Sequence, residues 1–254
     1  MLRITDMKRF KGLKKIPSKI RSYFELEKTF KEFKKLSKEK GDRFPVLWKD
    51  IFFISNENTD NTGFDAHYVY HPAWAARVLA KTRPEYHVDV SSILHFSSIV
   101  SAFIPIRFYE YRPAHLNLDN LTCGKADLVA LPFKDASIKS ISCMHTMEHV
   151  GLGRYGDKID PNGDIKAINE LKRVTAPKGD ILFVVPIGKA KLLFNAHRIY
   201  SYAQIIEYFG KDFELKDFFL IPDTAITHGV IYNATKEDSD KQNYGCGCFW
   251  FKKK

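Results

Sequence analysis

The sequence has few cysteines, no long apolar run and no internal repeat. Four cysteines in 254 residues are too few for a small disulfide-stabilised scaffold, and 14 glycines with 11 prolines exclude a collagen-like chain. No stretch approaches the roughly 18 consecutive apolar residues that a membrane-spanning helix needs. Met1 to Phe10 lacks the apolar segment of a secretory leader. We therefore expect a protein of the reducing cytoplasm.

The net charge of +10 is concentrated at the N-terminus. Residues 1–40 contain 14 Lys and Arg against 5 Asp and Glu, whereas residues 41–254 contain 26 against 25. A nearly neutral body does not favour binding to a nucleic-acid backbone, so we expect no nucleic-acid partner. The 44% hydrophobic content is enough for one large core.

The basic segment has the pattern of an amphipathic helix. Its apolar residues recur at steps of three and four, at Ile20, Tyr23, Leu26, Phe30, Phe33 and Leu36. This face can pack on the domain or on a partner subunit, or it can lie on the anionic inner face of the cell membrane. We divide the chain into this extension (1–40), a polar connector (41–63) and one large domain (64–254), and leave the oligomeric state open.

The large domain alternates between strand and helix patterns. The segments that predict helices are 72–80, 96–103 and 165–174, the last with Asp164 as N-cap. The segments that predict strands are 86–90, 106–109, one near Thr122, 138–143, 181–185, 213–221 and 246–251. The continuous apolar run 181–185 is typical of a central parallel strand. We predict an α/β fold with a doubly wound Rossmann-like sheet, mostly parallel, whose last strand is antiparallel.

Acidic residues occur where ligand contacts are expected in such a sheet. Ligands bind beyond the carboxyl ends of parallel strands. Asp89 ends the first strand, Glu110 follows the second, and Asp127 precedes the fourth. An acid after the second strand can accept both ribose hydroxyls, and one before the fourth can accept an adenine amino group, so this pattern indicates a nucleoside-containing cofactor.

Three blocks in this region resemble the class I S-adenosylmethionine-dependent methyltransferases: ADLVALPFKDASI (126–138), MEHV (147–150) and ELKRVTAPKGDILFVVP (170–186). The blocks HYVYHPAWAARV (67–78), HVDVSS (87–92), TMEHVGLGRYGDKIDPNGD (146–164) and FNAHRIY (194–200) resemble, more narrowly, the family catalogued as domain of unknown function 268. The resemblance implies S-adenosylmethionine as cofactor and a sugar or sugar-linked acceptor in cell-surface polysaccharide biosynthesis. The cofactor residues implied are Asp89, Ser91, Ser92, Glu110, Asp127, Leu128 and His145.

The turn after the first strand departs from the superfamily pattern because it contains no glycine. Glycines there allow positive φ angles and close approach of the backbone to the cofactor. This turn reads DVSSILH (89–95). Either Ser91 and Ser92 supply hydroxyl donors instead, or the chain is a binding or scaffold protein that has kept the fold and lost the cofactor.

Two polar loops supply the catalytic candidates. GLGRYGD (151–157) predicts a tight loop beyond the fourth strand, and FNAHRIY lies beyond the fifth, so the two loops are expected to face each other across the site. We predict His149 as the general base for an acceptor hydroxyl, with Glu148 orienting it, and Arg154 and Arg198 as a clamp for an anionic group. The full set of catalytic candidates is His149, Glu148, His197, Arg154, Tyr155, Asp157 and Arg198.

Two patterns resemble metal sites. His145, Glu148 and His149 fit the H-x-x-E-H pattern of zinc hydrolases, but His145 is expected at a strand end, where the two histidines would not share a helical face. Cys246 and Cys248 share one face of a strand, without a second cysteine pair at zinc-ribbon spacing. We interpret them as buried strand cysteines and assign no metal ligands, leaving the zinc hydrolase as a lesser alternative.

Overall fold

The computed structural model describes residues 18–55, 57–91 and 93–254. Its contacts divide the chain after Gly63 into two units, residues 1–63 and 64–254, which are described separately. Ser92, one of the predicted cofactor residues, lies outside the described residues. Within the described part of the chain, no helix has the length and apolar character required to cross a bilayer.

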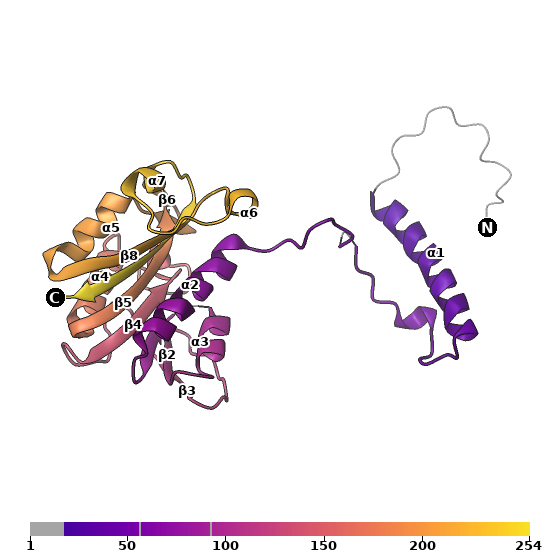
Figure 1. The fold of residues 1–254 in the computed structure, drawn as a ribbon, viewed down its shortest axis with the longest axis horizontal. Helices are drawn as coiled ribbons and strands as arrows, with labels where there is room; N and C mark the ends of the chain where they lie inside the picture. Colours follow the sequence, from indigo (N-terminus) through magenta and orange to yellow (C-terminus); the bar gives the residue numbers. More distant parts are fainter. Residues whose placement is uncertain (1–17, 56, 92) are drawn as a thin grey trace. The chain divides into compact units, whose positions relative to one another are not determined.

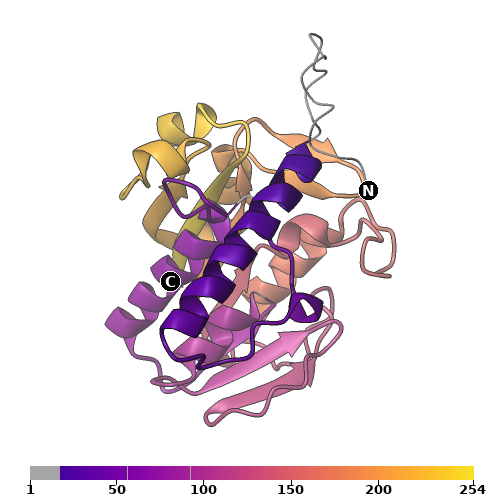
Figure 2. The same cartoon turned by 90° about the vertical axis from the view of Figure 1, so that its right-hand side faces the viewer.

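The first unit contains one long helix, α1 (Ser18–Glu39), which Figure 2 shows in indigo as a continuous coil. A short 3₁₀ turn, η2 (Trp48–Asp50), follows it. The Trp48 ring meets the rings of Tyr23 and Phe30 edge-on, with centroids 6.3 and 5.0 Å away. Phe24 and Phe33 remain more than half exposed, so the apolar surface of α1 is only partly covered.

The second unit is built on a seven-stranded sheet (Figure 1). In spatial order the strands are β3 (Leu121–Lys125), β2 (Ile106–Glu110), β1 (His87–Val90), β4 (Ile138–Met144), β5 (Thr175–Ile187), β9 (Gly245–Lys253) and β8 (Phe213–Ile221). The pairs from β3 to β5 are parallel, and β9 runs antiparallel to both β5 and β8. The predicted fold, including the antiparallel last strand, is confirmed.

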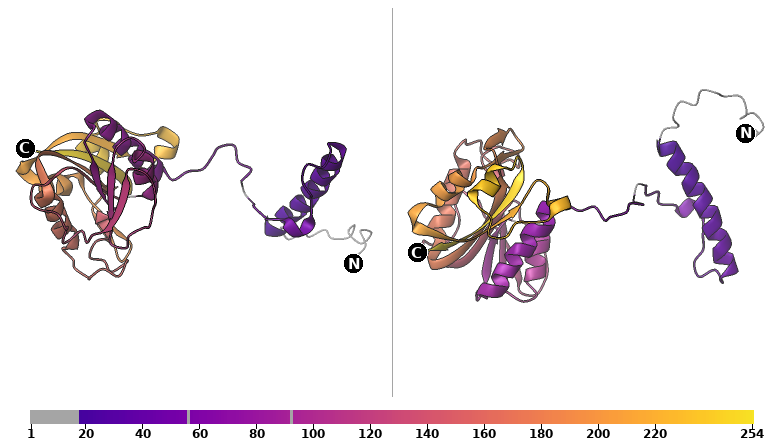
Figure 3. Two further views of the ribbon diagram at one scale, coloured as in Figure 1. Left: turned by 90° about the horizontal axis from the view of Figure 1, so that it is seen from below. Right: turned by 45° about the horizontal axis from the view of Figure 1, so that its top comes forward.

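Helices cover both faces of this sheet (Figure 3). The four longer ones are α2 (Ala66–Thr82), α3 (Leu94–Val100), α4 (Gly163–Val174) and α5 (Tyr202–Phe209). Apolar residues of α2 and α3 share one buried cluster, and those of α4 and α5 share the other. Smaller elements are η3 (Met147–His149), the hairpin β6 (Lys191–Leu193) with β7 (His197–Ile199), η4 (Gly210–Asp212), α6 (Ala225–His228) and α7 (Lys236–Asp240).

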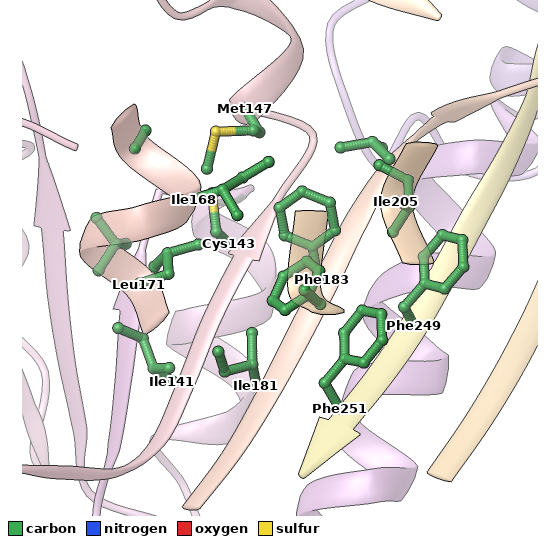
Figure 4. Close-up of a cluster of buried hydrophobic side chains, with 14 of the residues drawn as sticks. Ile141, Cys143, Met147, Ile168, Leu171, Ile181, Phe183, Ile205, Phe249 and Phe251 are labelled. Atoms are coloured by element: carbon green, nitrogen blue, oxygen red, sulfur yellow. The ribbon is translucent and has the colours of Figure 1, made fainter. Parts of the chain in front are cut away.

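The core around β5 explains its continuous apolar run. Ile181, Phe183 and Val185 contribute to the cluster under α4 and α5, while Leu182 and Val184 contribute to the cluster under α2 and α3. Figure 4 shows Phe183 among side chains of the first cluster. A strand that buries both of its faces cannot alternate with polar residues.

Two predicted helix starts are wrong, for identifiable reasons. The helix expected from Pro72 begins at Ala66, where the Asp65 side chain accepts a hydrogen bond from the Tyr68 amide, and it continues through Pro72. The expected N-cap of α4, Asp164, lies inside the helix, and the N-cap is Asn162. Asp164 instead accepts the Tyr200 hydroxyl at 2.9 Å, a tertiary bond that the local pattern does not reveal.

Candidate functional site

A cavity of about 260 Å³ opens at the carboxyl ends of the central strands. Such a position is where open α/β sheets bind ligands. The predicted residues that line it are Ser91, Glu110, Asp127, Leu128, His145, His149, Tyr155 and Asp157. The cavity therefore brings together residues that were assigned separately to the cofactor and to catalysis.

The turn after β1 adopts a glycine-like conformation without a glycine. Ser91 has φ +57°, in the left-handed region, and its amide donates to the carbonyl of Tyr109 at 2.9 Å. The Thr146 hydroxyl donates to the Ser91 carbonyl at 2.9 Å, which fixes the turn against the end of β4. An L-residue in this conformation costs about 1–2 kcal/mol, so the surrounding bonds hold the turn in the shape for which glycine is normally needed.

The acids expected at the cofactor are placed by the sheet. Glu110 is the last residue of β2, and Asp127 lies in a tight turn after β3, where its carboxylate accepts the Val129 amide at 3.1 Å. No helix occurs in the β2–β3 and β3–β4 connections, residues 111–120 and 126–137, which the structure describes throughout. These loops bring Arg112 and Leu128 into the cavity wall.

Asp89 does not line the cavity, contrary to expectation. It is fully buried in β1, and its two carboxylate oxygens accept hydroxyls of Ser97 at 2.5 Å and Ser142 at 2.7 Å. Ser142 in turn bonds His87 at 2.9 Å. The side chain that was expected to contact the cofactor thus joins β1 to α3 and β4.

His149 is held in one orientation at the cavity wall. Its Nδ1 lies 2.6 Å from the Ala196 carbonyl oxygen, which can only accept, so Nδ1 carries a proton and, in the neutral ring, the lone pair is on Nε2. The edge of Tyr155 meets the His149 ring, with centroids 5.6 Å apart. A neutral histidine with a fixed tautomer is suited to accept a proton.

Glu148 is fully buried and holds His145 more closely than His149. Its Oε1 accepts Nδ1–H of His145 at 2.8 Å, whereas Nε2 of His149 lies 3.8 Å away. Burial opposes ionisation of Glu148, but the positive charge of His145 and its hydrogen bond lower the pKa of this carboxyl. The predicted orienting contact with His149 is therefore the weaker of the two.

Asp157 organises the glycine loop. Its Oδ2 accepts the amides of Gly151 at 2.8 Å and Gly153 at 3.3 Å, and Oδ1 accepts the Tyr155 amide at 3.2 Å. Gly151 has φ +80°, and a Cβ there would lie 2.1 Å from the Asp160 carbonyl oxygen. Although it borders the cavity, Asp157 is occupied by the backbone of its own loop.

The predicted pair of arginines does not form a clamp. Arg154 donates to the Ala196 carbonyl at 3.1 Å, so the two polar loops do meet. Arg198 donates to the Val150 carbonyl at 2.7 Å and lies 3.4 Å from Asp164, away from the cavity lining. His197 is also outside that lining, with its ring centroid 5.0 Å from that of Tyr244. Burial lowers the pKa of His197.

The cavity residues that were not predicted from the sequence include Tyr68, Tyr111 and Arg112. Tyr68 belongs to the first turn of α2, a helix that was predicted to begin only at Pro72. Burial and the nearby charge of Glu148 raise the pKa of Tyr68 to about 12, so it stays a hydrogen-bond donor at neutral pH. Arg112 lies over the Tyr155 ring, 4.6 Å from its centroid. The sequence signal for this earlier start was Asp65, because aspartate is a preferred residue at helix N-caps.

The fold is similar to that of a solved methyltransferase. The 1,6-didemethyltoxoflavin-N1-methyltransferase of Burkholderia thailandensis, solved with S-adenosylhomocysteine, superposes with a TM-score of 0.50 over 96% of this chain and 93% of that chain, at 9% identity. This protein has the class I methyltransferase fold. The N-methyltransferase NodS of Bradyrhizobium japonicum is similar with a TM-score of 0.49 over 74% of this chain and 87% of that one, at 9% identity.

Sequence comparisons cover less of this methyltransferase-fold chain. Residues 134–219, about a third of the chain, match the family described as "Caenorhabditis protein of unknown function, DUF268". An uncharacterized protein of Methanocaldococcus jannaschii is 29% identical over 105 residues, which are 40% of this chain and 39% of that protein's length. The two resemblances suggested by the sequence, to the superfamily and to domain of unknown function 268, are confirmed.

Proposed function

We propose that the protein is an S-adenosylmethionine-dependent methyltransferase that acts on a hydroxyl of a sugar or sugar-linked group, with His149 as general base. One observation carries the proposal: a single cavity at the carboxyl ends of the strands is lined by the Ser91 turn, Glu110 and Asp127 together with His149. The class I methyltransferase fold places ligands at this edge of the sheet.

The cavity residues fit the chemical groups of this cofactor. Glu110, at the end of β2, would accept ribose hydroxyls, and Asp127 with Leu128 would receive the adenine. The left-handed backbone at Ser91 gives the cofactor the close approach to the main chain that a glycine turn would give. Bound S-adenosylmethionine would supply an electrophilic methyl group.

The work of the protein is then to align the acceptor and to remove its proton. The Nδ1–H bond to the Ala196 carbonyl leaves Nε2 of His149 free to take the proton of an acceptor hydroxyl. Alignment supplies most of the acceleration in such a displacement, and a general base adds about 10²-fold to 10⁴-fold.

The sugar acceptor is proposed from the family resemblance and from the chemistry of the cavity wall. Tyr68, Tyr155 and Arg112 offer hydroxyl and guanidinium donors beside aromatic faces. Incubation with methyl-labelled cofactor and separate panels of sugar nucleotides, lipid-linked sugars, peptides and small amines tests this part. Label found only on peptides or amines would contradict the sugar acceptor.

Calorimetry separates the enzyme from the cofactor-free scaffold that the turn without glycine also suggested. Saturable binding of both S-adenosylmethionine and S-adenosylhomocysteine by the folded protein is expected. Absence of binding by either would support the scaffold protein and reject the methyltransferase.

The role of His149 is tested by single-turnover methyl transfer once an acceptor is found. His149→Ala is expected to slow the chemical step by about 10²-fold to 10⁴-fold while cofactor affinity stays unchanged. His228→Ala, which alters an exposed histidine of α6, is the matched control. Equal single-turnover rates for His149→Ala and the wild type would contradict the assignment.

The N-terminal extension is proposed to hold the protein at an anionic lipid surface. The exposed apolar residues of α1, among them Ile20, Phe24 and Phe33, occur on a strongly basic segment, a combination that binds such surfaces. Full-length protein is expected to float with phosphatidylserine vesicles, and protein lacking residues 1–40 is expected to stay behind. Equal flotation of the two would contradict the proposal.

A further inference from the structure

Three metal-ligating side chains converge next to the cavity. His67, His145 and Cys246 each offer one ligand atom, and these atoms lie within 4.8 Å of one another. His145 and Cys246 are buried, and His67 is half-buried. The sequence patterns did not bring these three residues together, because they paired His145 with His149 and Cys246 with Cys248.

The topology explains why these distant residues meet. His145 directly follows β4, and Cys246 lies near the start of β9, where it pairs with Pro186 close to the end of β5. Because β9 runs antiparallel, its beginning reaches the same sheet edge as the ends of β4 and β5. His67 comes from the first turn of α2, whose helix packs against β8 and β9.

The hydrogen bonds of His145 leave one ring nitrogen directed to a ligand. Its Nδ1–H donates to buried Glu148 at 2.8 Å, and its other nitrogen, Nε2, has the Cys246 thiol as its neighbour and no other hydrogen-bond partner among the described residues. A metal-binding histidine commonly has this arrangement, in which a carboxylate receives one ring N–H and the other nitrogen binds the ion. A buried polar atom without a partner otherwise costs about 1–3 kcal/mol.

A second histidine in the same cluster repeats the pattern. His71 donates Nδ1–H to the His67 carbonyl at 2.6 Å, and its buried Nε2 lacks a partner within the described chain. The ring centroids of His71 and His67 lie 5.1 and 5.3 Å from that of His145. A second histidine with an unsatisfied ring nitrogen thus packs against His145, although its ligand atom is not one of the three that lie within 4.8 Å of one another.

We propose that His67, His145 and Cys246 bind a transition-metal ion of the zinc class. Imidazole nitrogens with a thiolate sulfur are ligands preferred by Zn²⁺, and harder cations such as Mg²⁺ and Ca²⁺ prefer oxygen. When the ion binds, the Cys246 thiol and the protonated Nε2 of His145 each release a proton to solvent, while Nδ1–H stays bonded to Glu148. The ion joins α2, β9 and the end of β4, so it supports the cavity wall that contains His145 and Tyr68.

This site differs from the zinc-hydrolase arrangement considered from the sequence. His145 has φ +55° in the connection after β4, and His149 belongs to a short 3₁₀ turn, so the two do not share a helical face. Glu148 bonds a ring nitrogen of His145 and is buried, which is a supporting position rather than that of a carboxylate activating water.

The test uses full-length protein without a histidine tag, loaded with Zn²⁺ and then dialysed. One Zn²⁺ per chain is expected by elemental analysis, and Co²⁺ substitution should give the near-ultraviolet absorption of a thiolate-bound cobalt ion. Folded wild-type protein that retains no stoichiometric metal would overturn the proposal.

Variants assign the ligands. Cys246→Ser should lose the retained metal and the cobalt–thiolate band, and Cys248→Ser, on the same strand with its sulfur 3.9 Å from that of Cys246, should keep both. If Cys246→Ser does not fold, His67→Gln provides a second ligand variant, because His67 is only half-buried and lies in the first turn of α2. Full retention by a folded Cys246→Ser or His67→Gln variant would overturn the assignment.

Two further variants separate this site from its neighbours. Glu148→Gln should lower Zn²⁺ affinity by about 10-fold to 100-fold, measured by competition with a chromophoric chelator, because it weakens the support of His145. His149→Ala should leave the affinity unchanged. Loss of metal in His149→Ala would overturn the proposed ligand set in favour of the His145–His149 pair.

Discussion

The two sides of the cavity are built differently. The cofactor side, residues 90, 91, 93, 110–112 and 126–128, consists of strand ends and short turns, and few of its side chains bond one another. The histidine side, residues 67–71 and 145–149, buries groups that depend on one another, such as the ion pair of His145 with Glu148. We therefore expect a single substitution on the cofactor side to change only the contacts of that residue, and one on the histidine side to disturb the neighbouring buried groups as well.

The strongest test of this difference is removal of Glu110 from the cofactor side. Glu110→Ala should weaken S-adenosylmethionine binding by about 10-fold to 100-fold, because hydrogen bonds to a charged group contribute about 1.5–3 kcal/mol. The free energy of unfolding should change little, since Glu110 bonds only the neighbouring Tyr111 amide among the hydrogen bonds described for its side chain. Calorimetry and urea unfolding measure the two quantities.

Glu214→Ala is the control for Glu110→Ala, because Glu214 is an exposed residue of β8 paired with Lys216. Glu214→Ala should change neither the affinity for S-adenosylmethionine nor the free energy of unfolding. Unfolding of Glu110→Ala at markedly lower urea than the wild type would contradict the view that the cofactor side acts locally.

The difference between the two sides also explains which site residues could be predicted from the sequence. Glu110 and Asp127 could be located because strand ends are visible as the limits of apolar runs, and the sheet then decides which ends are neighbours. Asp89 also lies at a strand end in the sequence, as Glu110 does. Its carboxylate, however, is buried and accepts hydrogen bonds from the hydroxyls of Ser97 and Ser142. Whether a carboxylate at a strand end faces a ligand or the core depends on these tertiary bonds.

The histidine side could be predicted less well, because its contacts join distant segments. His67 and Cys246 come from opposite ends of the domain and meet only through the antiparallel β9. Arg198 looked like an anion ligand, but the Val150 carbonyl and Asp164 occupy its guanidinium. Local sequence patterns indicated the residue types on this side, but their hydrogen-bond and ion-pair partners are determined by the tertiary structure.

Buried histidines offer a second, smaller test. His87, buried in β1, bonds the hydroxyls of Ser140 and Ser142 and has no carboxylate partner in the described part of the chain, so burial lowers its pKa to about 3. His145 shifts in the opposite direction. Burial lowers the pKa of His145, but Cys246 and Glu148 together raise it. Burial also raises the pKa of the Cys246 thiol well above its ordinary value.

The pH dependence of stability follows from the shift of His87. Below pH 6.5 the unfolded chain protonates this histidine and the folded chain does not until about pH 3, so stability falls as pH falls through this window. The slope from this one group approaches about 1.4 kcal/mol per pH unit. His87→Asn should remove that slope between pH 6 and 4 in urea unfolding, and a slope identical to that of the wild type would contradict a neutral His87.

The smallest expected effect concerns Ser91, where the cofactor side departs from the pattern of its superfamily. Ser91→Gly relieves the left-handed strain, about 1–2 kcal/mol, and adds the backbone entropy of glycine, about 0.5–1 kcal/mol, so stability should change by less than about 1.5 kcal/mol. If the cofactor needs only the backbone shape, S-adenosylmethionine affinity should stay within about twofold of the wild type by calorimetry. A loss of binding would show that the cofactor requires the Ser91 hydroxyl. Serine would then be a functional replacement for glycine in this turn, since its own hydrogen bond to the Tyr109 carbonyl, at 3.5 Å, is too long to explain its presence.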